Sequence, residues 1–390
     1  MNSFKNELIT NILPFWMNRM QDDSFGGFYG QIDGEGQLHP KANKGAILNA
    51  RILWTFSAAY RLLRDARYLA IAQRAFDYIT RYFIDEEHGG VYWELDCRGN
   101  PVNMKKQTYA QGFMLYGFSE FYRATANPLA MELSKKFFGL IEKCHDNNYG
   151  GYLEAFTRDW QPIEDVRLSE KDANEKKTMN THLHILEPYT NLLRIWRDDG
   201  LITAQRRLID IFITKIIDRS TNHLNLFFDE EWSVKSAGVS FGHDIEASWL
   251  LFEAAQVLGD KELEEKVKEV SLKIADTASE GLEPDGGMAY ERVEDHTDKE
   301  RHWWVQAEAV VGYMYAYQNS GDARYKENAS DVWSYIRDHL VDKENGEWFW
   351  SCFPDGSINR KEDKAGFWKC PYHNGRMCME MMEKFGQKVK

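Results

Sequence analysis

Positive charge is scarce in this chain. Its 390 residues include 48 lysines and arginines against 61 aspartates and glutamates, which gives a formal net charge of −13 at pH 7. Proteins that bind nucleic acids or anionic membranes usually carry a basic stripe or patch. The charge balance therefore argues against both kinds of partner.

Long apolar runs and paired cysteine motifs are also missing. The chain contains no run of about 18 apolar residues, which is the length needed to cross a bilayer. Residues 1–7 lack the apolar core of a secretory signal. The five cysteines form no CxxC pair, and their odd number leaves at least one outside any disulfide scheme. We therefore expect a cytoplasmic protein with reduced thiols.

Apolar and aromatic residues, by contrast, are plentiful. Hydrophobic residues make up 43% of the chain and aromatic residues 14%. That content can fill a large core. An aromatic excess can also supply platforms for flat apolar faces such as those of sugar rings.

A short glycine-plus-aromatic phrase, such as Gly26-Gly27-Phe28-Tyr29, returns six times along the chain. Its second glycine, or the equivalent residue, lies at Gly27, Gly90, Gly151, Asn225, Gly287 and Gly346, so the intervals are 63, 61, 74, 62 and 59 residues. A fixed period indicates one supersecondary unit that is copied and stacked. Length alone would suggest two or three domains. The repeat instead predicts a single domain over residues 1–390.

Each unit has the pattern helix, helix, then a loop with β character. Residues 50–56 and 68–76 show helical spacing of apolar residues, and residues 90–96 alternate before a turn at 98–101. Six helical hairpins commonly close into an (α/α)6 barrel. We predict this all-α fold, with short β-hairpin loops at one end. An open superhelix with a peptide groove is the alternative, although the usual helical arrays have shorter periods and no such loop.

A second set of phrases, in phase with the glycines, opens one helix in each unit. Each phrase places a polar residue just before an apolar helix rich in small residues, such as residues 247–255. Helices that are apolar all round are inner helices, so these opening turns should face one shared cavity. The phrases span residues 49–54, 109–113, 180–187, 242–247, 303–308 and 372–376.

Three histidines lie at equivalent helix openings in three different units. A single histidine in such a place is more often a capped or solvated residue, but three equivalent ones point to a shared site of His184, His243 and His373. His243 and Glu246 are three residues apart and should share a helix face. Glu246 can then orient the His243 ring or raise its basicity.

The spacing around His184 also bears on metals and on the helix start. His184 shares a face with Glu187, three residues on, whereas His182 and His184 diverge on a helix and form a poor metal chelate. Pro188 fits badly in a helix already running at Asn180. We therefore expect a start nearer His184, or a kink.

Five other candidate residues lie within or beside these phrases. Arg51 lies in an otherwise apolar inner helix, where an unpaired charge is costly, so we favour a site role over a surface ion pair. Glu308 is either a site residue or a buried structural partner. Trp303, Trp304 and Trp368 flank the polar clusters and are either core residues or sugar platforms.

These residue types suit proton transfer near neutral pH. Imidazole has an unperturbed pKa of about 6.5 and can both take and give a proton there. Two histidines on opposite sides of one carbon could remove a proton from one face and return one to the other. Arg51 would stabilise the enediolate oxygen, a contribution of about 10²–10³ in rate. This is an epimerase or isomerase mechanism without nucleotide, metal or other cofactor.

The same phrases carry a family resemblance. The chain resembles the N-acylglucosamine 2-epimerase superfamily, and most closely its cellobiose 2-epimerase members, over essentially residues 1–390. The resemblance implies an (α/α)6 barrel and reversible C2 epimerisation of the reducing-end glucose of cellobiose and related β-1,4-linked disaccharides. The phrases that carry it are residues 180–189, 242–246, 301–308 and 368–373.

The resemblance also implies a role for each position. His243 and His373 would be the acid/base pair, and His184 would assist opening and closing of the sugar ring. Arg51 would bind the reacting oxygens and Glu246 would hold His243. The residues expected to bind substrate are Tyr109, Asn180, Trp303, Trp304, Glu308 and Trp368.

Rival functions remain open at this point. N-acylglucosamine epimerases and mannose isomerases would share the histidines and differ around the far end of the sugar. An inverting (α/α)6 glycoside hydrolase would use two carboxylates, for which Glu246 and Glu308 are candidates. A sugar-binding protein without catalysis would need only the aromatic platforms. We expect a monomer or a weak homodimer.

Overall fold

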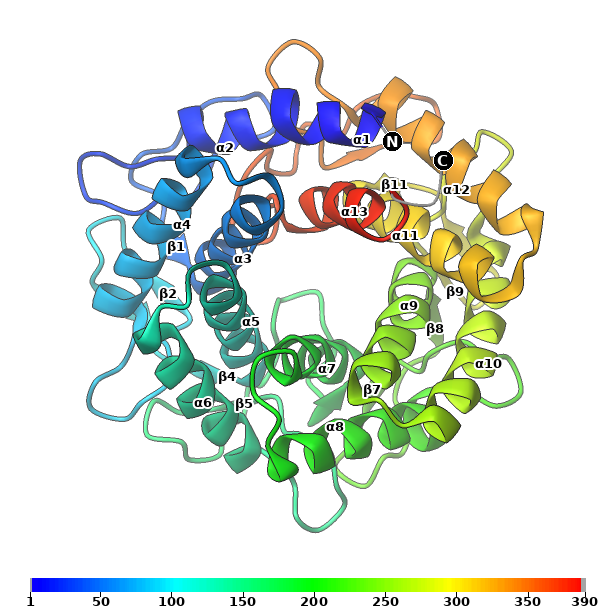
Figure 1. Cartoon of the computed structure of the whole chain (residues 1–390), viewed down its shortest axis with the longest axis horizontal. Coiled ribbons are helices and arrows are strands. Elements are labelled where there is room, and N and C mark those ends of the chain that lie inside the picture. Colours follow the sequence, from blue (N-terminus) through cyan, green and yellow to red (C-terminus); the bar gives the residue numbers. More distant parts are fainter. Residues whose placement is uncertain (1, 387–390) are drawn as a thin grey trace.

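The computed structural model describes residues 2–386 and has two concentric layers of helices (Figure 1). The inner layer is almost wholly buried, because apolar residues lie on every side of its helices. It consists of α3 (Ala46–Leu63), α5 (Thr108–Thr125), α7 (Met179–Leu193), α9 (Phe241–Leu258), α11 (Trp303–Ser320) and α13 (Tyr372–Glu383).

The outer helices are amphipathic and cover the inner layer. In α8, for example, Leu201, Ala204 and Leu208 are buried at helical spacing while the opposite face is polar. The outer elements are α1 (Asn2–Glu7) with η1 (Leu8–Ile12) and α2 (Leu13–Arg19), α4 (Ala66–Tyr78) with η2 (Ile79–Phe83), α6 (Pro128–Lys143), α8 (Asp199–Ile211) with η3 (Phe212–Ile216), α10 (Lys261–Ala278) with η4 (Ser279–Gly281), and α12 (Ala323–Tyr335) with η5 (Ile336–Leu340).

The inner layer closes on itself. The last inner helix, α13, packs against both α11 and α3, and the chain ends of the barrel meet through a β-bridge between Ile32 and Ala365. The predicted (α/α)6 barrel is therefore confirmed, and the open superhelix is wrong. Among the described residues, no helix combines the length and apolar character of a membrane span.

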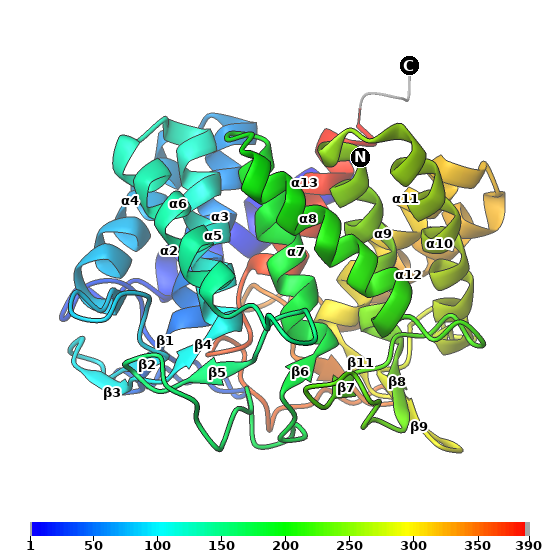
Figure 2. The same ribbon diagram turned by 90° about the horizontal axis from the view of Figure 1, so that it is seen from below.

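Short antiparallel strands gather at one end of the barrel (Figure 2). In most units a strand just before an inner helix pairs with a strand one unit further along the chain. The pairs are β1 (Lys44–Gly45) with β2 (Glu94–Leu95), β4 (Lys106–Gln107) with β5 (Ala155–Phe156), β6 (Lys177–Thr178) with β7 (Phe227–Phe228), β8 (Gly238–Ser240) with β9 (Glu291–Val293), and β11 (Arg301–His302) with β12 (Ser351–Cys352); β3 (Pro101–Asn103) and β10 (His296–Asp298) extend two of these sheets.

Each inner helix has one polar residue at an equivalent place in its first turn, which we call the clasp residue; in α5, α7 and α11 this residue bonds both the glycine phrase and the backbone just before the helix. In α5, Gln111 accepts a hydrogen bond from the Val91 backbone N–H (3.0 Å) of the glycine phrase and donates one to the Gln107 carbonyl (3.2 Å). His182 makes the same two contacts in α7, with the Tyr152 N–H (2.9 Å) and the Thr178 carbonyl (2.6 Å). The clasp positions are Asn49, Gln111, His182, Asp244, Gln306 and Asn374.

The predicted late start of the third inner helix is wrong. Helix α7 begins at Met179, where the Thr178 side chain accepts a hydrogen bond from the Thr181 N–H, and it runs through Pro188. Proline removes the N–H that would bond to the His184 carbonyl. Gly112 of α5 packs against that carbonyl so closely that a Cβ there would lie 2.4 Å from its oxygen. Close packing between inner helices thus accommodates the proline.

Candidate active site

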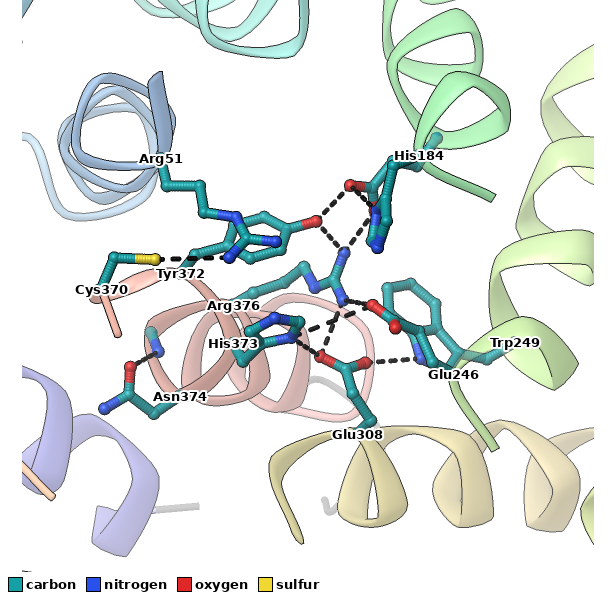
Figure 3. A network of polar contacts seen from close by, with 12 residues as sticks. Arg51, His184, Glu246, Trp249, Glu308, Cys370, Tyr372, His373, Asn374 and Arg376 are labelled. Atoms are coloured by element: carbon teal, nitrogen blue, oxygen red, sulfur yellow. Dashed lines mark hydrogen bonds and ion pairs between the residues drawn. The ribbon is translucent and has the colours of Figure 1, made fainter. Parts of the chain in front are cut away.

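Six side chains at one repeat-equivalent position, two residues after each clasp residue, form the base of the candidate site. Figure 3 shows that the polar ones point toward one another from different inner helices. All of them are buried. The six residues are Arg51, Phe113, His184, Glu246, Glu308 and Arg376.

His373 stands beside Glu308. Its Nδ1 lies 2.7 Å from Glu308 Oε1, and its ring lies 5.7 Å from the Trp304 ring, centroid to centroid. The other Glu308 oxygen, Oε2, accepts a hydrogen bond from Trp249 Nε1 at 3.0 Å. A carboxylate at Nδ1 leaves Nε2 as the nitrogen free to exchange a proton with a ligand.

His184 has an equivalent carboxylate partner. Its Nδ1 lies 3.1 Å from Glu187 Oε1, as the spacing of three residues predicts. The Tyr372 hydroxyl also donates to Glu187 Oε1. The Tyr109 ring packs edge-on against the His184 ring with centroids 5.0 Å apart.

His243 has different surroundings from the other two histidines. It is partly exposed, its Nδ1 contacts Ser240 Oγ at 2.9 Å, and its ring lies 4.7 Å from the Trp304 ring. The predicted contact with Glu246 is not made. Glu246 Oε1 instead accepts a hydrogen bond from Arg376 at 2.6 Å and lies 3.9 Å from His373 Nδ1, because the buried guanidinium is the stronger partner.

Burial sets the protonation states of the site. It lowers the pKa of His184 and His373, and it lowers the pKa of His243 to about 3, so all three rings are neutral in the free protein. Burial also raises the pKa of Glu246, and the nearby Glu308 raises it further. Burial opposes ionisation of Glu187 as well, but the Arg376 charge outweighs it and brings the Glu187 pKa to about 2.

Arg51 is a buried cation that forms no ion pair within the described residues. Its guanidinium donates to the Tyr109 hydroxyl at 2.9 Å and to the Trp368 carbonyl at 3.4 Å, and it lies 4.3 Å from the Phe113 ring centroid and 4.9 Å from that of Tyr372. Its Nε has no hydrogen-bond partner. A desolvated positive charge without a carboxylate leaves the site ready for an anionic ligand oxygen.

The remaining predicted residues lie around these six side chains and differ in how exposed they are. Trp304 and Trp368 are partly exposed beside the histidines, and Asn180 is partly exposed with its Oδ1 unpaired. Trp303 is buried and packs against Trp350 with ring centroids 4.5 Å apart, and its ring centroid lies 6.4 Å from that of His373. Tyr109 reaches the site through Arg51.

Four further residues meet in this network without having been singled out from the sequence as site residues. Glu187, Trp249, Tyr372 and Arg376 hold the predicted ones through the hydrogen bonds described above. The repeat contains a signal for one of them. Arg376 lies two residues after its clasp residue, in the position that Arg51 occupies in the first unit.

Two sets of side chains here could in principle hold a metal ion. They are His184, Glu187 and Glu246, and Glu246, Glu308 and His373, with donor atoms within 4.8 Å of one another. All three carboxylates already accept hydrogen bonds from Arg376, whose fixed positive charge opposes a cation in the same place. The donor sets therefore fit a guanidinium better than a metal.

The close approach of Glu246 and Glu308 also bears on the hydrolase alternative. Their oxygens lie within 4.8 Å of each other and bond to the same Arg376 nitrogen. An inverting glycoside hydrolase needs about 6.5–9.5 Å between its carboxyl groups, to admit a water molecule. This spacing argues against that mechanism.

Comparisons with known proteins show the family to which the chain is similar. Residues 27–375 match the family model of N-acylglucosamine 2-epimerase (GlcNAc 2-epimerase). A cellobiose 2-epimerase of Bacteroides fragilis is 56% identical over 381 residues, covering 97% of each chain, and one of Ruminococcus albus is 40% identical, covering 98% of each. The solved cellobiose 2-epimerase of Bacillus thermoamylovorans has a TM-score of 0.94 at 41% identity, again over 98% of each chain.

The relatives with the rival activities are more distant. A D-mannose isomerase of Marinomonas mediterranea is 20% identical, covering 93% of this chain and 92% of its own. The human N-acylglucosamine 2-epimerase is 23% identical, and the match covers 96% of this chain and 88% of the human one.

Proposed function

Because this chain belongs to the N-acylglucosamine 2-epimerase family, we propose that it interconverts glucose and mannose at the reducing end of cellobiose and related β-1,4-linked disaccharides. It is a carbohydrate epimerase, an enzyme of the isomerase class. The observation that carries the disaccharide substrate is the 56% identity to a cellobiose 2-epimerase over nearly the full length of both chains.

Two histidines from different helices supply the proton transfers. The rings of His373 and His243 both lie close to the Trp304 ring, with centroid distances of 5.7 and 4.7 Å. In the open-chain sugar, one neutral imidazole takes the C2 proton and becomes an imidazolium, and the other ring takes up a proton from water before it returns one to the opposite face of C2. The first ring then releases its proton to water, so both rings are neutral again at the end of the turnover.

The intermediate between these steps is a cis-enediolate with negative charge on oxygen. Arg51 supports it, because its buried guanidinium has no carboxylate partner. His184, held by the ionised Glu187, assists ring opening and closing. Asn180, Tyr109, Trp304, Trp368 and Glu308 are the proposed binding and positioning residues around the reacting sugar.

The reaction as proposed needs no cofactor, since each step is a proton transfer or an oxygen stabilisation that the side chains supply. We further propose one catalytic domain over residues 1–390 and a cytoplasmic location, in keeping with the five free cysteines. A monomer or weak homodimer is proposed because the exposed large apolar side chains of the described residues are scattered over separate elements.

Incubation with cellobiose in D2O, followed by NMR, tests the proposal. We expect glucosyl-mannose with deuterium at C2. Release of free glucose would instead indicate a hydrolase, and an unchanged sugar with saturable binding would indicate a binding protein. Free N-acetylglucosamine and mannose serve as competing substrates for the two rival activities.

The roles of the two bases are tested by His243→Ala and His373→Ala. Each should abolish formation of the epimer while the far-ultraviolet circular dichroism stays unchanged. Substantial epimerisation by either variant would contradict the two-base scheme.

A further inference from the structure

A single guanidinium joins the carboxylates that hold two of the site histidines. Arg376 is 1% exposed and lies one helical turn beyond His373 on α13. It donates to Glu187 at 2.6 Å, to Glu246 at 2.6 Å and to Glu308 at 2.7 Å, so that α7, α9 and α11 all meet at one residue of α13 (Figure 3).

Two of these three carboxylates contact imidazole nitrogens. Glu187 contacts Nδ1 of His184 and Glu308 contacts Nδ1 of His373. The Arg376 charge lowers the pKa of Glu187 to about 2, so this carboxylate is ionised and favours a proton on Nδ1 of His184. Burial raises the pKa of Glu308, but its Oε1 accepts a hydrogen bond from Arg376 and its Oε2 accepts one from Trp249, and both contacts favour the ionised form, which accepts a hydrogen bond from Nδ1 of His373. Glu246, whose second oxygen has no partner, is the carboxyl of the three best placed to hold a proton.

We propose that Arg376 is a positioning residue that fixes the Nδ1–H tautomer of both His184 and His373, so that both Nε2 atoms are the ones offered to the substrate. This proposal rests on the proposed epimerase function for its kinetic consequences only. The tautomers themselves are a property of the free protein.

The surroundings of Arg376 suit this role better than that of a simple structural ion pair. Its guanidinium lies 4.4 Å from the Tyr372 ring centroid and 4.7 Å from that of Trp249, and these two side chains also donate to Glu187 and Glu308. The aromatic rings thus fix the plane of the guanidinium, and each ring orients one carboxylate. A lysine keeps the charge but lacks the planar fork that reaches three carboxylates.

The first test is made on the wild-type protein. Nitrogen-15 NMR of the histidine rings at pH 7 should show Nδ1–H and unprotonated Nε2 at His184 and His373, assigned with His184→Gln and His373→Gln. An Nε2–H tautomer at either residue overturns the proposal, whatever the activity. Failure of the proposed function would appear separately, as no deuterium incorporation at C2 with the tautomers as expected.

The second test compares Arg376→Lys and Arg376→Met with the matched variant Arg61→Met. Arg61 also bridges carboxylates, Glu120 of α5 and Glu383 of α13, but in the last turns of the inner helices. We expect a fall in kcat of about 100-fold or more for Arg376→Met with a small change in KM, a mixture of histidine tautomers, and a partial recovery in Arg376→Lys.

Arg61→Met separates a positioning role from loss of stability. It should lower the melting temperature while kcat per folded molecule and the two tautomers stay as in the wild type. If Arg376→Met unfolds, Arg376→Lys carries the comparison. Unchanged tautomers and pH profile in a folded Arg376 variant, or an equal loss of kcat in Arg61→Met, would overturn the proposal.

Discussion

At the scale of single residues, Arg51 makes the sharpest contrast with the other buried arginines. Arg376 and Arg301 are each held by at least one carboxylate, whereas Arg51 has only hydroxyl, carbonyl, thiol and ring contacts. An unpaired buried charge costs stability. Such a cost is typical of a group kept for function.

Replacing Arg51 with methionine should therefore separate activity from stability. We expect kcat to fall by about 10²–10³, because the enediolate loses its cation. The melting temperature should stay equal or rise, since a desolvated cation gives way to an apolar chain of similar length. Thermal unfolding and initial rates measure the two effects, and a large loss of stability would show that Arg51 is mainly structural.

The neutral histidines predict the acid limb of the rate profile. Burial lowers the pKa of His184, His243 and His373, so a base in the free enzyme is lost to protonation only below the ordinary value of about 6.5. The acid limb of kcat/KM should accordingly have its midpoint below pH 6.5. A midpoint at or above 6.5, measured where the protein stays folded, would contradict this.

The sequence could reveal this site only in part. The three histidines, Arg51 and Glu246 come from repeat-equivalent helix openings, which periodicity can locate. Periodicity cannot say which carboxylate contacts which ring: the spacing predicts that Glu246 contacts His243, whereas Glu246 accepts a hydrogen bond from Arg376. That choice depends on side chains from four helices meeting in three dimensions.

At the scale of elements, the clasp contacts explain why a polar residue lies in the first turn of α5, α7 and α11. His182 occupies a clasp position and makes the contacts that Gln111 makes in α5 and Gln306 makes in α11. The spacing predicts that His182 and His184 diverge, and His182 instead bonds the backbone of the Tyr152 loop and of Thr178. The role of His182 is to bond the loop of the preceding unit and the strand before its own helix. The sequence alone does not show that this loop lies next to His182.

The clasp predicts that glutamine can replace one histidine and not its neighbour. In His182→Gln the amide can accept from the Tyr152 N–H and donate to the Thr178 carbonyl, so activity should stay within a few-fold of wild type. His184→Gln, on the same helix, should lose almost all activity. Epimerisation rates compare the two, and a comparable loss in both would mean that His182 has a catalytic part.

Removing the clasp altogether should instead cost stability. In His182→Leu the buried Tyr152 N–H loses its acceptor, which costs about 1–3 kcal/mol of unfolding free energy. Urea denaturation measures this cost, with His182→Gln as the matched control. Equal stability of the two variants would show that the hydrogen bonds are not needed.

At the scale of the whole molecule, the ring is closed by contacts between the two ends of the chain. Trp16 donates to Glu347 at 2.5 Å and Trp348 donates to Glu7 at 2.8 Å, and α1 packs against α13. The period of the repeat predicted the number of units. Closure could not be read from it, because it depends on the small rotation that each unit adds to the last.

A closed ring should unfold as one unit, unlike an open array of repeats that can fray from its ends. We expect coincident urea transitions by far-ultraviolet circular dichroism and by tryptophan fluorescence. Deleting residues 2–19 should abolish the shared transition, because it removes both tryptophan–glutamate contacts. Separate transitions in the intact protein would contradict closure as the source of cooperativity.

The clasp residues and the residues two places after them have different roles in the repeat. The first set is polar in every unit and, in α5, α7 and α11, holds the backbone of a glycine phrase. The second set varies more: its residues are arginine, phenylalanine, histidine, glutamate, glutamate and arginine. If the units arose by duplication of one gene segment, these six positions began with the same residue. Each position could then change separately, while the residues that hold the barrel together stayed the same.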